Sequence, residues 1–545
     1  MSELTFDYIV IGAGSAGCVI ANRLSADPSV RVALVEAGES YTRFPLNLKV
    51  KLPFGNIFLL PDARYNWNDE FIASDANPDR RIPCPRGRIV GGCSAVNGTV
   101  YMRGHASDYD EWQAQGNEGW SYEDVLPAFK AHENWKLDVN GEFHGRGGEL
   151  NVATVPSPNA ISAALIDGGR ETGHEATRDF NGPSQDGFGL FSVNQRNGMR
   201  MSSAEAFLRP AKGRRNLTLL DGALVERINV ENGRATGITV VRQGKRQTIR
   251  AAQEIVLSAG TINSPHLLML SGIGPASELN RHGIEVVADL PGVGRNLQDH
   301  PAVGVAVEDT SGHTLALSWK TLPKLTAQAL RYILTRKGVF ASNVAEVGGF
   351  LRSRPGLNRP DVQVTFLMGL KTAAALIPRQ HGFVALVNIC RPESRGRLEL
   401  RSASPLDRPK LTANFLDNQN DVDTLVRGIR EVRRVIRSTA MKPYAGKELL
   451  PGDQVTGDAD LEAYVRSTVA TVYHPVGTCK MGPASDPMAV VDPQLRVRGI
   501  AGLRVADASI MPSIVAGNTS APAMMIGERA AAFILGERKI DRRAA

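Results

Sequence analysis

The sequence predicts two structural parts: an α/β domain with a Rossmann-like opening, built from discontinuous segments, and an α+β domain with an antiparallel sheet and flanking helices. Three observations lead to this prediction. The chain opens with strand, glycine-turn and helix signals, apolar strands ending in small residues recur late in the chain, and the stretch between them alternates short strands with a helix. A chain of 545 residues is also too long for one ordinary core.

The opening of the chain fits a βαβ unit. Residues 6–11 and 31–36 are apolar strands, as expected for a sheet covered on both faces, and residues 15 to about 26 form the helix between them. Residues 42 to about 148 are rich in Pro, Gly, Asn and Arg, a composition typical of extended cover over a ligand.

Later segments extend both parts. The strand in "EIVLSAG" (254–260) suits the first sheet, and the strand in 503–512 precedes a polar cap and a helix over 518–535. The substrate part holds the strands "FVALVNI" and "GRLELRS" and a helix at about 421–438. We assign residues 1–160, 212–303 and 470–545 to a nucleotide-binding domain, and residues 161–211 and 304–469 to a substrate-binding domain.

Composition narrows the class of protein. The net charge is +7, but basic and acidic residues are interspersed, so we expect no nucleic-acid partner. Five cysteines without a CxxC pair argue against a disulfide framework and a zinc site, and fit a reducing cytoplasm. The sequence has neither a signal-peptide pattern nor an apolar run that could span a bilayer, so we expect a cytoplasmic protein, soluble or peripheral at the membrane.

A GxGxxG motif follows the first strand and opens the first helix. It comprises Gly12, Gly14 and Gly17, with Ser15 at the start of the helix. The glycines permit a tight turn and close approach of a pyrophosphate, whose charge is met by free N–H groups and the helix dipole. Glu36, at the end of the second strand, is placed to accept hydrogen bonds from a ribose and disfavours a 2′-phosphate, which makes NADP a poor fit.

Two further stretches suggest a flavin. In "GRIVGGCSAVNG" (87–98), small residues would let a flat ring lie close, with contacts from Gly91, Gly92, Ser94, Asn97 and Gly98; the alternative is a loop that is glycine-rich only for turning.

Near the C-terminus, Asp507 ends a strand, and Asn518 and Thr519 begin a helix whose dipole would stabilise a reduced flavin; the alternative for Asn518 is a plain helix cap.

His474 lies between a tyrosine and a proline in "TVYHPVGTCKMG" (471–482). Because a residue before proline is pushed toward extended backbone, His474 is expected on a rigid strand or turn. This placement suits a catalytic group and also a buried histidine satisfied by one hydrogen bond.

Six stretches, in order over nearly the whole chain, together resemble the glucose/methanol/choline (GMC) family of flavoprotein oxidoreductases: "DYIVIGAGSAGCVIANRLS", "GGCSAVNGTVYMRG", "SAGTINSPHLLMLSGIG", "GVGRNLQDH", "YHPVGTCKMG" and "LRVADASIMPSIVAGNTSAPAMMIGERAA". The resemblance implies an FAD domain of the glutathione reductase or p-hydroxybenzoate hydroxylase type. Through "YMRGHASDYDEW" and "SNVAEVGGF" the chain resembles bacterial alcohol dehydrogenases of the choline, aliphatic alcohol and sorbose branch.

The resemblance also implies residue roles. His474 matches the active-site histidine of the family, and Asn518 matches a second active-site position that is His or Asn in different members. Val225 matches a contact to the adenine, and Asp507 a contact near the phosphate or ribityl chain of the flavin. Residues 91–98 would lie against the isoalloxazine ring, and Gly12, Gly14, Gly17 and Glu36 match the set that binds ADP.

Two positions depart from the family pattern. Members that hold FAD covalently have a histidine where this chain has Val96, so we expect noncovalent FAD. Cys390, followed by Arg-Pro, occurs where many relatives have an aliphatic residue, and also resembles a branch of light-driven fatty-acid decarboxylases. A small buried apolar cysteine is the preferred interpretation.

We therefore expect FAD-dependent oxidation of a primary alcohol to an aldehyde. His474 would act as acid/base, Asn518 would hold the alcohol oxygen, and the electrons would pass to a quinone, a dye or oxygen. We favour an uncharged alcohol; choline is the alternative, with Tyr473 and Glu346 as candidate contacts to its cation. The amphipathic, basic residues 320–338 predict a surface helix, which is either an ordinary solvated helix, a cover over the site entrance, or a contact with an anionic membrane.

Overall fold

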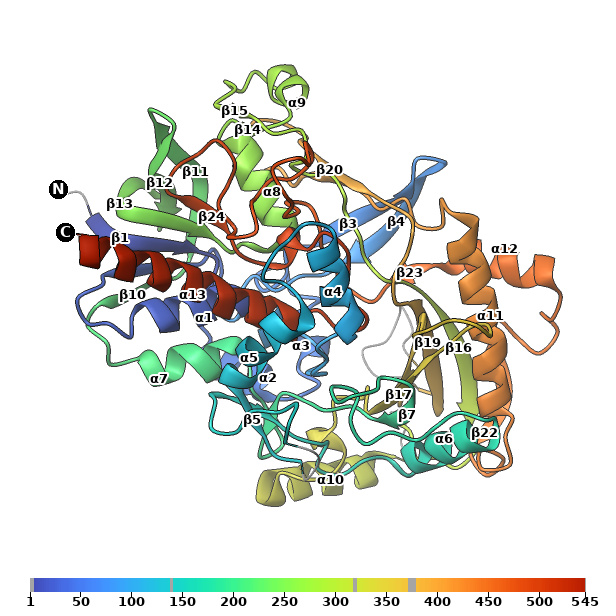
Figure 1. Cartoon of the computed structure of the whole chain (residues 1–545). Helices are drawn as coiled ribbons and strands as arrows, with labels where there is room; N and C mark the ends of the chain where they lie inside the picture. Colours follow the sequence, from blue (N-terminus) through green and yellow to red (C-terminus); the bar gives the residue numbers. More distant parts are fainter. Residues whose placement is uncertain (1–3, 138–140, 317–320, 371–378, 545) are drawn as a thin grey trace.

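The computed structural model describes residues 4–137, 141–316, 321–370 and 379–544. Its nucleotide-binding part is built on a sheet with strand order β10-β2-β1-β13-β12-β11, in which β24 also pairs with β13 (Figure 1). The strands are β1 (Leu4–Ile11), β2 (Val32–Val35), β10 (Leu217–Leu220), β11 (Ala223–Glu231), β12 (Arg234–Arg242), β13 (Lys245–Leu257) and β24 (Leu503–Val505). Segments from both halves of the chain therefore form one sheet, as the sequence predicts.

The strands β10, β2, β1, β13 and β24 run parallel, whereas β13, β12 and β11 form an antiparallel meander. Helix α1 (Ser15–Leu24) follows the glycine turn and packs against α13 (Ser520–Ala544), which runs beside it in Figure 1. The close approach depends on Gly527, where a Cβ atom would lie 2.8 Å from the carbonyl oxygen of Ala16. Helix α8 (Gly260–Leu270) follows β13.

A second, antiparallel sheet forms the substrate-binding part. Its strand order is β22-β16-β19-β18-β17-β7, with β23 also paired to β16. The strands are β7 (Gly187–Leu190), β16 (Pro301–Asp309), β17 (Val347–Leu351), β18 (Val362–Leu367), β19 (Gly382–Ile389), β22 (Ala445–Leu450) and β23 (Ala470–Thr471). Antiparallel pairing lets one face of this sheet cover a ligand while the other carries helices.

Helix α11 (Gln419–Ile436) covers the outer face of this sheet, together with α6 (Ala160–Glu171) and α12 (Asp458–Thr468). Its buried apolar residues recur every three or four positions, at Val422, Leu425, Ile429 and Val432. At Gly428 a Cβ atom would lie 2.6 Å from Val387, so glycine allows the helix to lie directly on the strand.

A third sheet links the two parts, with the order β20-β21-β3-β4. Its strands are β3 (Asp69–Ser74), β4 (Asn77–Cys84), β20 (Arg397–Glu399) and β21 (Lys410–Thr412). The strand in "GRLELRS", β20, therefore belongs to this third sheet and not to the substrate sheet. Strand β23, in contrast, belongs to the substrate sheet. The assignment of residue ranges to two domains stays a prediction. The pairing of β21 with β3 joins a range of one assigned domain to a range of the other, and β23, which the assignment gives to the nucleotide-binding domain, pairs with β16 of the substrate sheet.

The remaining elements are short helices and short strands outside these three sheets. They are α2 (Leu46–Lys51), α3 (Asn56–Leu59), η1 (Gly92–Ala95), α4 (Ala106–Ala114), α5 (Tyr122–His132), β5 (Glu133–Trp135), β6 (Leu150–Val152), β8 (Gln195–Arg196), β9 (Met199–Arg200), η2 (Ala204–Leu208), α7 (Arg209–Ala211), β14 (Ile273–Gly274), α9 (Ala276–Arg281), β15 (Ala288–Asp289), α10 (Leu322–Thr335), η3 (Val339–Ala341) and η4 (Ala508–Ile510). Helices α4 and α5 carry buried aromatic side chains, so residues 42–148 contribute core as well as cover.

Candidate active site

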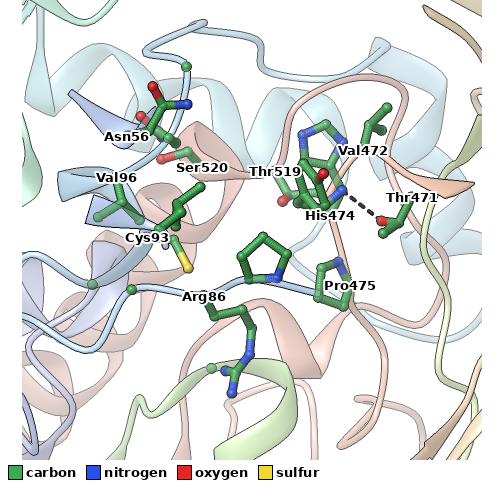
Figure 2. A pocket seen from close by; sticks show the side chains of 18 of the residues that line it. Asn56, Arg86, Cys93, Val96, Thr471, Val472, His474, Pro475, Thr519 and Ser520 are labelled. Atoms are coloured by element: carbon green, nitrogen blue, oxygen red, sulfur yellow. Dashed lines mark hydrogen bonds between the residues drawn. The ribbon is translucent and has the colours of Figure 1, made fainter. Parts of the chain in front are cut away.

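A cavity of about 1270 Å³ lies between the nucleotide-binding sheet and the inner face of the substrate sheet. The turn after β1, the end of β2 and the starts of α8 and α13 line one side, and strands β16, β18 and β19 line the other. In Figure 2, Cys93 and Val96 lie on one side of this pocket, while Thr471, His474 and Pro475 lie opposite them.

The glycines of the first turn have different structural reasons. Gly12 has φ +99°, and a Cβ atom there would lie 2.4 Å from the Ser258 carbonyl oxygen. A Cβ atom at Gly17 would lie 1.9 Å from the Gly12 carbonyl oxygen. Gly12, Gly14 and Ser15 all line the cavity. Of the three glycines, only Gly14 has open space at its Cβ position. Gly12 and Gly17 are therefore required by the turn itself, whereas Gly14 leaves room for a ligand.

Glu36 closes the far end of the cavity. Its carboxylate accepts hydrogen bonds from the backbone N–H of Ala13 and of Gly38, each at 2.9 Å. Burial raises the pKa of Glu36 to about 7, although these N–H donors oppose the rise. Two hydroxyl donors from a ribose would favour its charged form. Val225 also lines the cavity, and the N–H of Ala223, two residues before it, donates to the Glu36 carbonyl oxygen at 2.8 Å.

The second glycine-rich loop lies against the first turn. Gly91 donates its N–H to the carbonyl oxygen of Ala13 at 2.7 Å, and a Cβ atom at Gly92 would lie 2.8 Å from Gly14 Cα. Gly91 and Gly92 both have positive φ values. Gly98 has open space at its Cβ position and lines the cavity. Only small residues allow the two loops to meet while a flat ring passes beside them.

Two polar residues of this loop are directed into the protein. The Ser94 hydroxyl donates to the Gly91 carbonyl oxygen at 2.6 Å and lies 2.8 Å from the Ser203 hydroxyl. Asn97 lines the cavity, but its Oδ1 atom accepts a hydrogen bond from Arg200 at 2.8 Å. In the structure Ser94 therefore stabilises the loop on the side away from the cavity. Ser203 and Arg200 hold this loop through Ser94 and Asn97, and sequence reasoning did not identify them.

Asp507 joins the ends of two elements at the cavity wall. Its carboxylate accepts hydrogen bonds from the Gly260 N–H (2.9 Å), the Ser264 hydroxyl (2.6 Å) and the Ser509 N–H (2.8 Å). These bonds fix the first turn of α8 against η4. Thr519 and Ser520 line the cavity at the start of α13, and the buried Ser520 hydroxyl has no hydrogen-bond partner in the described protein.

These features fit a bound FAD. Gly14 and Gly98 present open backbone, Glu36 offers a carboxylate to a ribose, and the Ser520 hydroxyl is an orphaned polar group that a ligand would satisfy. The first turns of α1 and α13 also point free N–H groups at the cavity, which suits a diphosphate and a negatively charged flavin ring.

His474 is in a non-helical segment and lines the cavity, as expected for a residue before proline. Its Nδ1 atom lies 3.0 Å from Nδ1 of His300, and its Nε2 atom lies 3.0 Å from Nδ2 of Asn518. The structure thus brings together His474 and Asn518, which are 44 residues apart in the sequence.

The surroundings of His300 define the tautomer of His474. The Nε2 atom of His300 lies 3.0 Å from the Cys390 carbonyl oxygen and 3.1 Å from that of Val515, so Nε2 carries the hydrogen. Burial lowers the pKa of His300 to about 4, and burial together with His300 lowers the pKa of His474 well below its usual value. In the neutral pair, His300 Nδ1 accepts the Nδ1–H of His474, which leaves His474 Nε2 unprotonated.

Asp299 fixes the segment that carries His474. Its carboxylate accepts the N–H of His300 at 2.7 Å and of His474 at 2.9 Å, and the Thr471 hydroxyl donates to its other oxygen. Tyr473, between Thr471 and His474, has φ +69°, a strained value for a non-glycine residue. Its N–H donates to the Thr471 hydroxyl at 2.7 Å. Burial raises the pKa of Asp299 to about 7.

Sequence reasoning did not assign a role to Asp299 or His300. Both lie at the end of the stretch "GVGRNLQDH", which carries part of the family resemblance. An Asp-His pair just before a strand was the available signal, but the sequence does not show that this strand, β16, pairs with β23 next to His474.

Two further candidates are turned away from the cavity. Cys390 is buried in an apolar cluster with Met102 and Phe350, as the preferred interpretation predicts. The Glu346 carboxylate accepts the Asn159 N–H at 2.6 Å and lies 3.3 Å from the Ser162 hydroxyl. Neither geometry supports a direct contact with a ligand.

Within the described ranges, no three His, Cys, Asp or Glu side chains gather as a metal site would require. Likewise, no helix in these ranges combines the length and the apolar content needed to cross a bilayer.

The largely parallel sheet, the two glycine loops at its edge of the cavity and the histidine facing them define an FAD-dependent oxidoreductase. Two family models for GMC oxidoreductases match the chain, over residues 6–302 and 392–527. The chain belongs to the GMC oxidoreductase family, which confirms the family predicted from its motifs.

Known relatives agree over almost the whole length. The chain is 40% identical to an alcohol dehydrogenase [acceptor] of Pseudomonas putida, covering 98% of this chain and 96% of that protein. It is 41% identical to a mitochondrial choline dehydrogenase of Homo sapiens, covering 98% and 90%.

Solved structures show the same fold. Pyridoxine 4-oxidase from Mesorbium loti superimposes with a TM-score of 0.86 at 30% identity, covering 97% of this chain and 98% of the other. A formate oxidase variant from Aspergillus oryzae RIB40, studied for FAD modification, gives 0.90 at 26% identity, with 99% of each chain covered. These matches confirm the predicted fold class and FAD as the cofactor.

Proposed function

We propose that the protein oxidises an uncharged primary alcohol to an aldehyde, with His474 as the base. The observation that carries this proposal is the chain of contacts from the Cys390 and Val515 carbonyls through His300 to His474, which leaves His474 Nε2 free to accept a proton. FAD supplies the hydride acceptor, its N5 atom, when bound.

The residues of the chain then hold the alcohol and take its proton. The Asn518 amide, 3.0 Å from His474 Nε2, can donate instead to an alcohol oxygen placed between them. The hydroxyl proton passes to Nε2, and its removal favours loss of hydride from the carbon. Because burial lowers the pKa of His474, the imidazolium that forms is more acidic than that of an ordinary histidine and gives the proton up again more readily.

The substrate half of the cavity favours a neutral molecule. Among the described lining residues, the carboxylates are Glu36 and Asp507, which both belong to the nucleotide half. The inner face of the substrate sheet instead presents the amides of Gln363 and Asn388, followed along β18 and β19 by apolar side chains such as Leu367. This lining supports an alcohol with an apolar body.

Choline is the second candidate, because relatives at similar identity include choline dehydrogenases. Tyr473 lines the cavity and could face a cation, but the carboxylate of Glu346 is occupied by Asn159 and Ser162. A light-driven decarboxylase is a weaker alternative, since Cys390 lies in the apolar cluster.

We further propose that electrons leave to a quinone-type acceptor or to oxygen and that FAD is held without a covalent bond. Val96, which lines the pocket beside Cys93 in Figure 2, lacks a nucleophilic side chain for attachment. Acid precipitation of the yellow protein should release all flavin into the supernatant; flavin remaining on the denatured chain would contradict this.

The function is tested by an anaerobic absorbance titration with a panel of alcohols that includes 1-hexanol and choline. Bleaching of the flavin band by an alcohol supports the proposal, and the rates rank the two substrates. Return of the band in air identifies an oxidase. A flavin that stays reduced and bleached in air identifies a dehydrogenase. A bound flavin that no alcohol bleaches would refute the proposed reaction, and light-dependent alkane release from a fatty acid would establish the decarboxylase.

A further inference from the structure

Large apolar side chains are exposed on two segments that are about 280 residues apart in the sequence. In the first segment, Phe44 precedes α2, Leu48 lies in α2 and Phe58 lies in α3. In the second, Leu330, Ile333 and Leu334 lie on α10. Figure 1 shows α10 at the lower edge of the molecule, below α2 and α3. We call the exposed side chains of residues 43–58 and 324–337 the docking face.

Helix α10 presents apolar side chains to solvent. An amphipathic helix on a protein surface ordinarily buries such residues. Here Leu330, Ile333 and Leu334 are 58%, 65% and 73% exposed, while Tyr332 faces the protein and donates its hydroxyl hydrogen to the Gly198 carbonyl oxygen. An ordinary solvated helix does not explain this orientation.

Both segments are fixed to the same hairpin, β8–β9. Arg200 donates hydrogen bonds to the carbonyl oxygens of Val50 (2.9 Å) and Pro53 (2.8 Å), while Tyr332 bonds to Gly198 two residues earlier. The rings of Phe54 and Phe340 also lie 5.4 Å apart. The two segments therefore form one continuous surface.

The charges of this surface have a single sign. Arg43, Lys324, Arg331, Arg336 and Lys337 are exposed, and the sequence contains no Asp or Glu in residues 41–60 or 321–340. The next acid after the first segment, Asp62, is paired with Arg64. A second copy of this surface would be repelled, whereas an anionic surface with an apolar interior matches both properties.

The docking face adjoins the cavity. Phe54 and Ile57 line the cavity, while the neighbouring Phe58 is exposed. A membrane bound at this face would lie beside the α3 side of the site.

We propose that the docking face binds peripherally to an anionic phospholipid bilayer, with α10 lying in the interface between headgroups and acyl chains. The inference goes beyond alcohol oxidation and does not depend on it. If the proposed reaction also holds, this placement brings the site close to the phase in which apolar alcohols and quinones dissolve.

The test is co-sedimentation of the flavin-loaded full chain with vesicles of phosphatidylcholine alone or with 30% phosphatidylglycerol. The apolar variant replaces Leu330, Ile333 and Leu334 by Ser, with the exposed Leu406→Ser as its control. The charge variant combines Arg331→Glu and Lys337→Glu, with the exposed Lys245→Glu as its control. Flavin content and alcohol oxidation with a soluble dye report on folding.

We expect the wild type to bind the anionic vesicles, with an affinity that weakens as salt is added. Affinity should fall more than tenfold in each docking-face variant but not in the controls. For the charge variant the reason is that each basic residue contributes about fivefold, ~1 kcal/mol, at such a surface. Absence of wild-type binding at low salt, or equal binding by the variants, overturns the proposal. Self-association that these variants abolish would assign the face to a second copy and overturn it as well. An alcohol-inactive protein that still binds vesicles leaves this inference standing while refuting the proposed function.

Discussion

His300 and His474 meet through their Nδ1 atoms, 3.0 Å apart, although one precedes β16 and the other follows β23. Only one of these two nitrogens can carry a hydrogen if the pair is neutral. Because the Nε2–H of His300 is committed to the Cys390 and Val515 carbonyls, the hydrogen belongs to His474. Two backbone carbonyls from distant non-helical segments thus determine which nitrogen of His474 faces the cavity.

Replacing His300 should therefore change the protonation behaviour of His474. We expect His300→Ala to lower the rate of flavin reduction by roughly 10- to 100-fold, because the wrong tautomer of a catalytic base becomes accessible. Removing His300 also removes a cause of the lowered pKa of His474, so that the acid limb of kcat/KM moves to higher pH. Rapid-mixing absorbance at several pH values measures both effects.

His300→Asn should partly restore the rate, since its amide oxygen can accept the Nδ1–H of His474. The exposed His313→Ala serves as the control. An unchanged pH profile in His300→Ala would show that His300 only fills space.

The sequence predicted the framework because its signals are local. Apolar strands, the glycine turn at Gly12 and the polar start of the helix near Asn518 each depend on a few neighbouring residues, and β1, β2, β13 and α13 occur where these signals stand. The family resemblance then placed His474 and Asn518 in one site, and the structure brings them within 3.0 Å.

The residues that escaped prediction depend on contacts between distant segments. Asp299 and His300 acquire their positions from the pairing of β16 with β23, and Ser94 is turned inward by Ser203, 109 residues away. The pairing of β20 and β21 with β3 is equally invisible in local periodicity. The exposed side of α10 could not be inferred from its amphipathic pattern alone, because the pattern does not say which face is outward.

Gly12 and Gly14, two of the three glycines of the first turn, should respond differently to replacement by alanine. Gly14→Ala meets no protein atom within 4 Å and has an ordinary extended conformation, so the fold should persist while FAD affinity falls. Gly12→Ala places a Cβ atom 2.4 Å from the Ser258 carbonyl at φ +99°, which should destabilise the protein itself by several kcal/mol.

Flavin content and thermal unfolding of the flavin-free forms distinguish these outcomes. We expect Gly14→Ala to unfold at nearly the wild-type temperature once FAD is removed, and Gly12→Ala to unfold at a clearly lower one. A Gly14→Ala protein that retains full FAD would show that the ligand does not approach this turn closely.

Gln363 offers a way to test the neutral character of the substrate half. Gln363→Glu keeps the size of the side chain, and its partner Asn388, whose amide lies 3.4 Å away, can still donate to it. A carboxylate in the cavity lining should raise kcat/KM for choline roughly tenfold and lower it for 1-hexanol, because opposite charges attract strongly at a desolvated site. Gln363→Leu is the control for losing the amide alone. Equal effects of Glu and Leu on choline would place Gln363 outside the reach of the substrate.

His132 should make stability depend on pH. It is fully buried between Phe129 and Phe207, its ring nitrogens have no hydrogen-bond partner in the described protein, and burial lowers its pKa to about 3. Because the unfolded chain binds a proton at this histidine below about pH 6.5 and the folded chain does not, the folded state loses stability as pH falls from 6.5 toward 3, by about 2 kcal/mol at pH 5.

His132→Phe removes this proton uptake and keeps an aromatic ring. Denaturant unfolding at pH 7 and pH 5 should therefore show a smaller loss of stability in the variant than in the wild type, and an equal loss in both would mean that His132 is protonated in the folded protein.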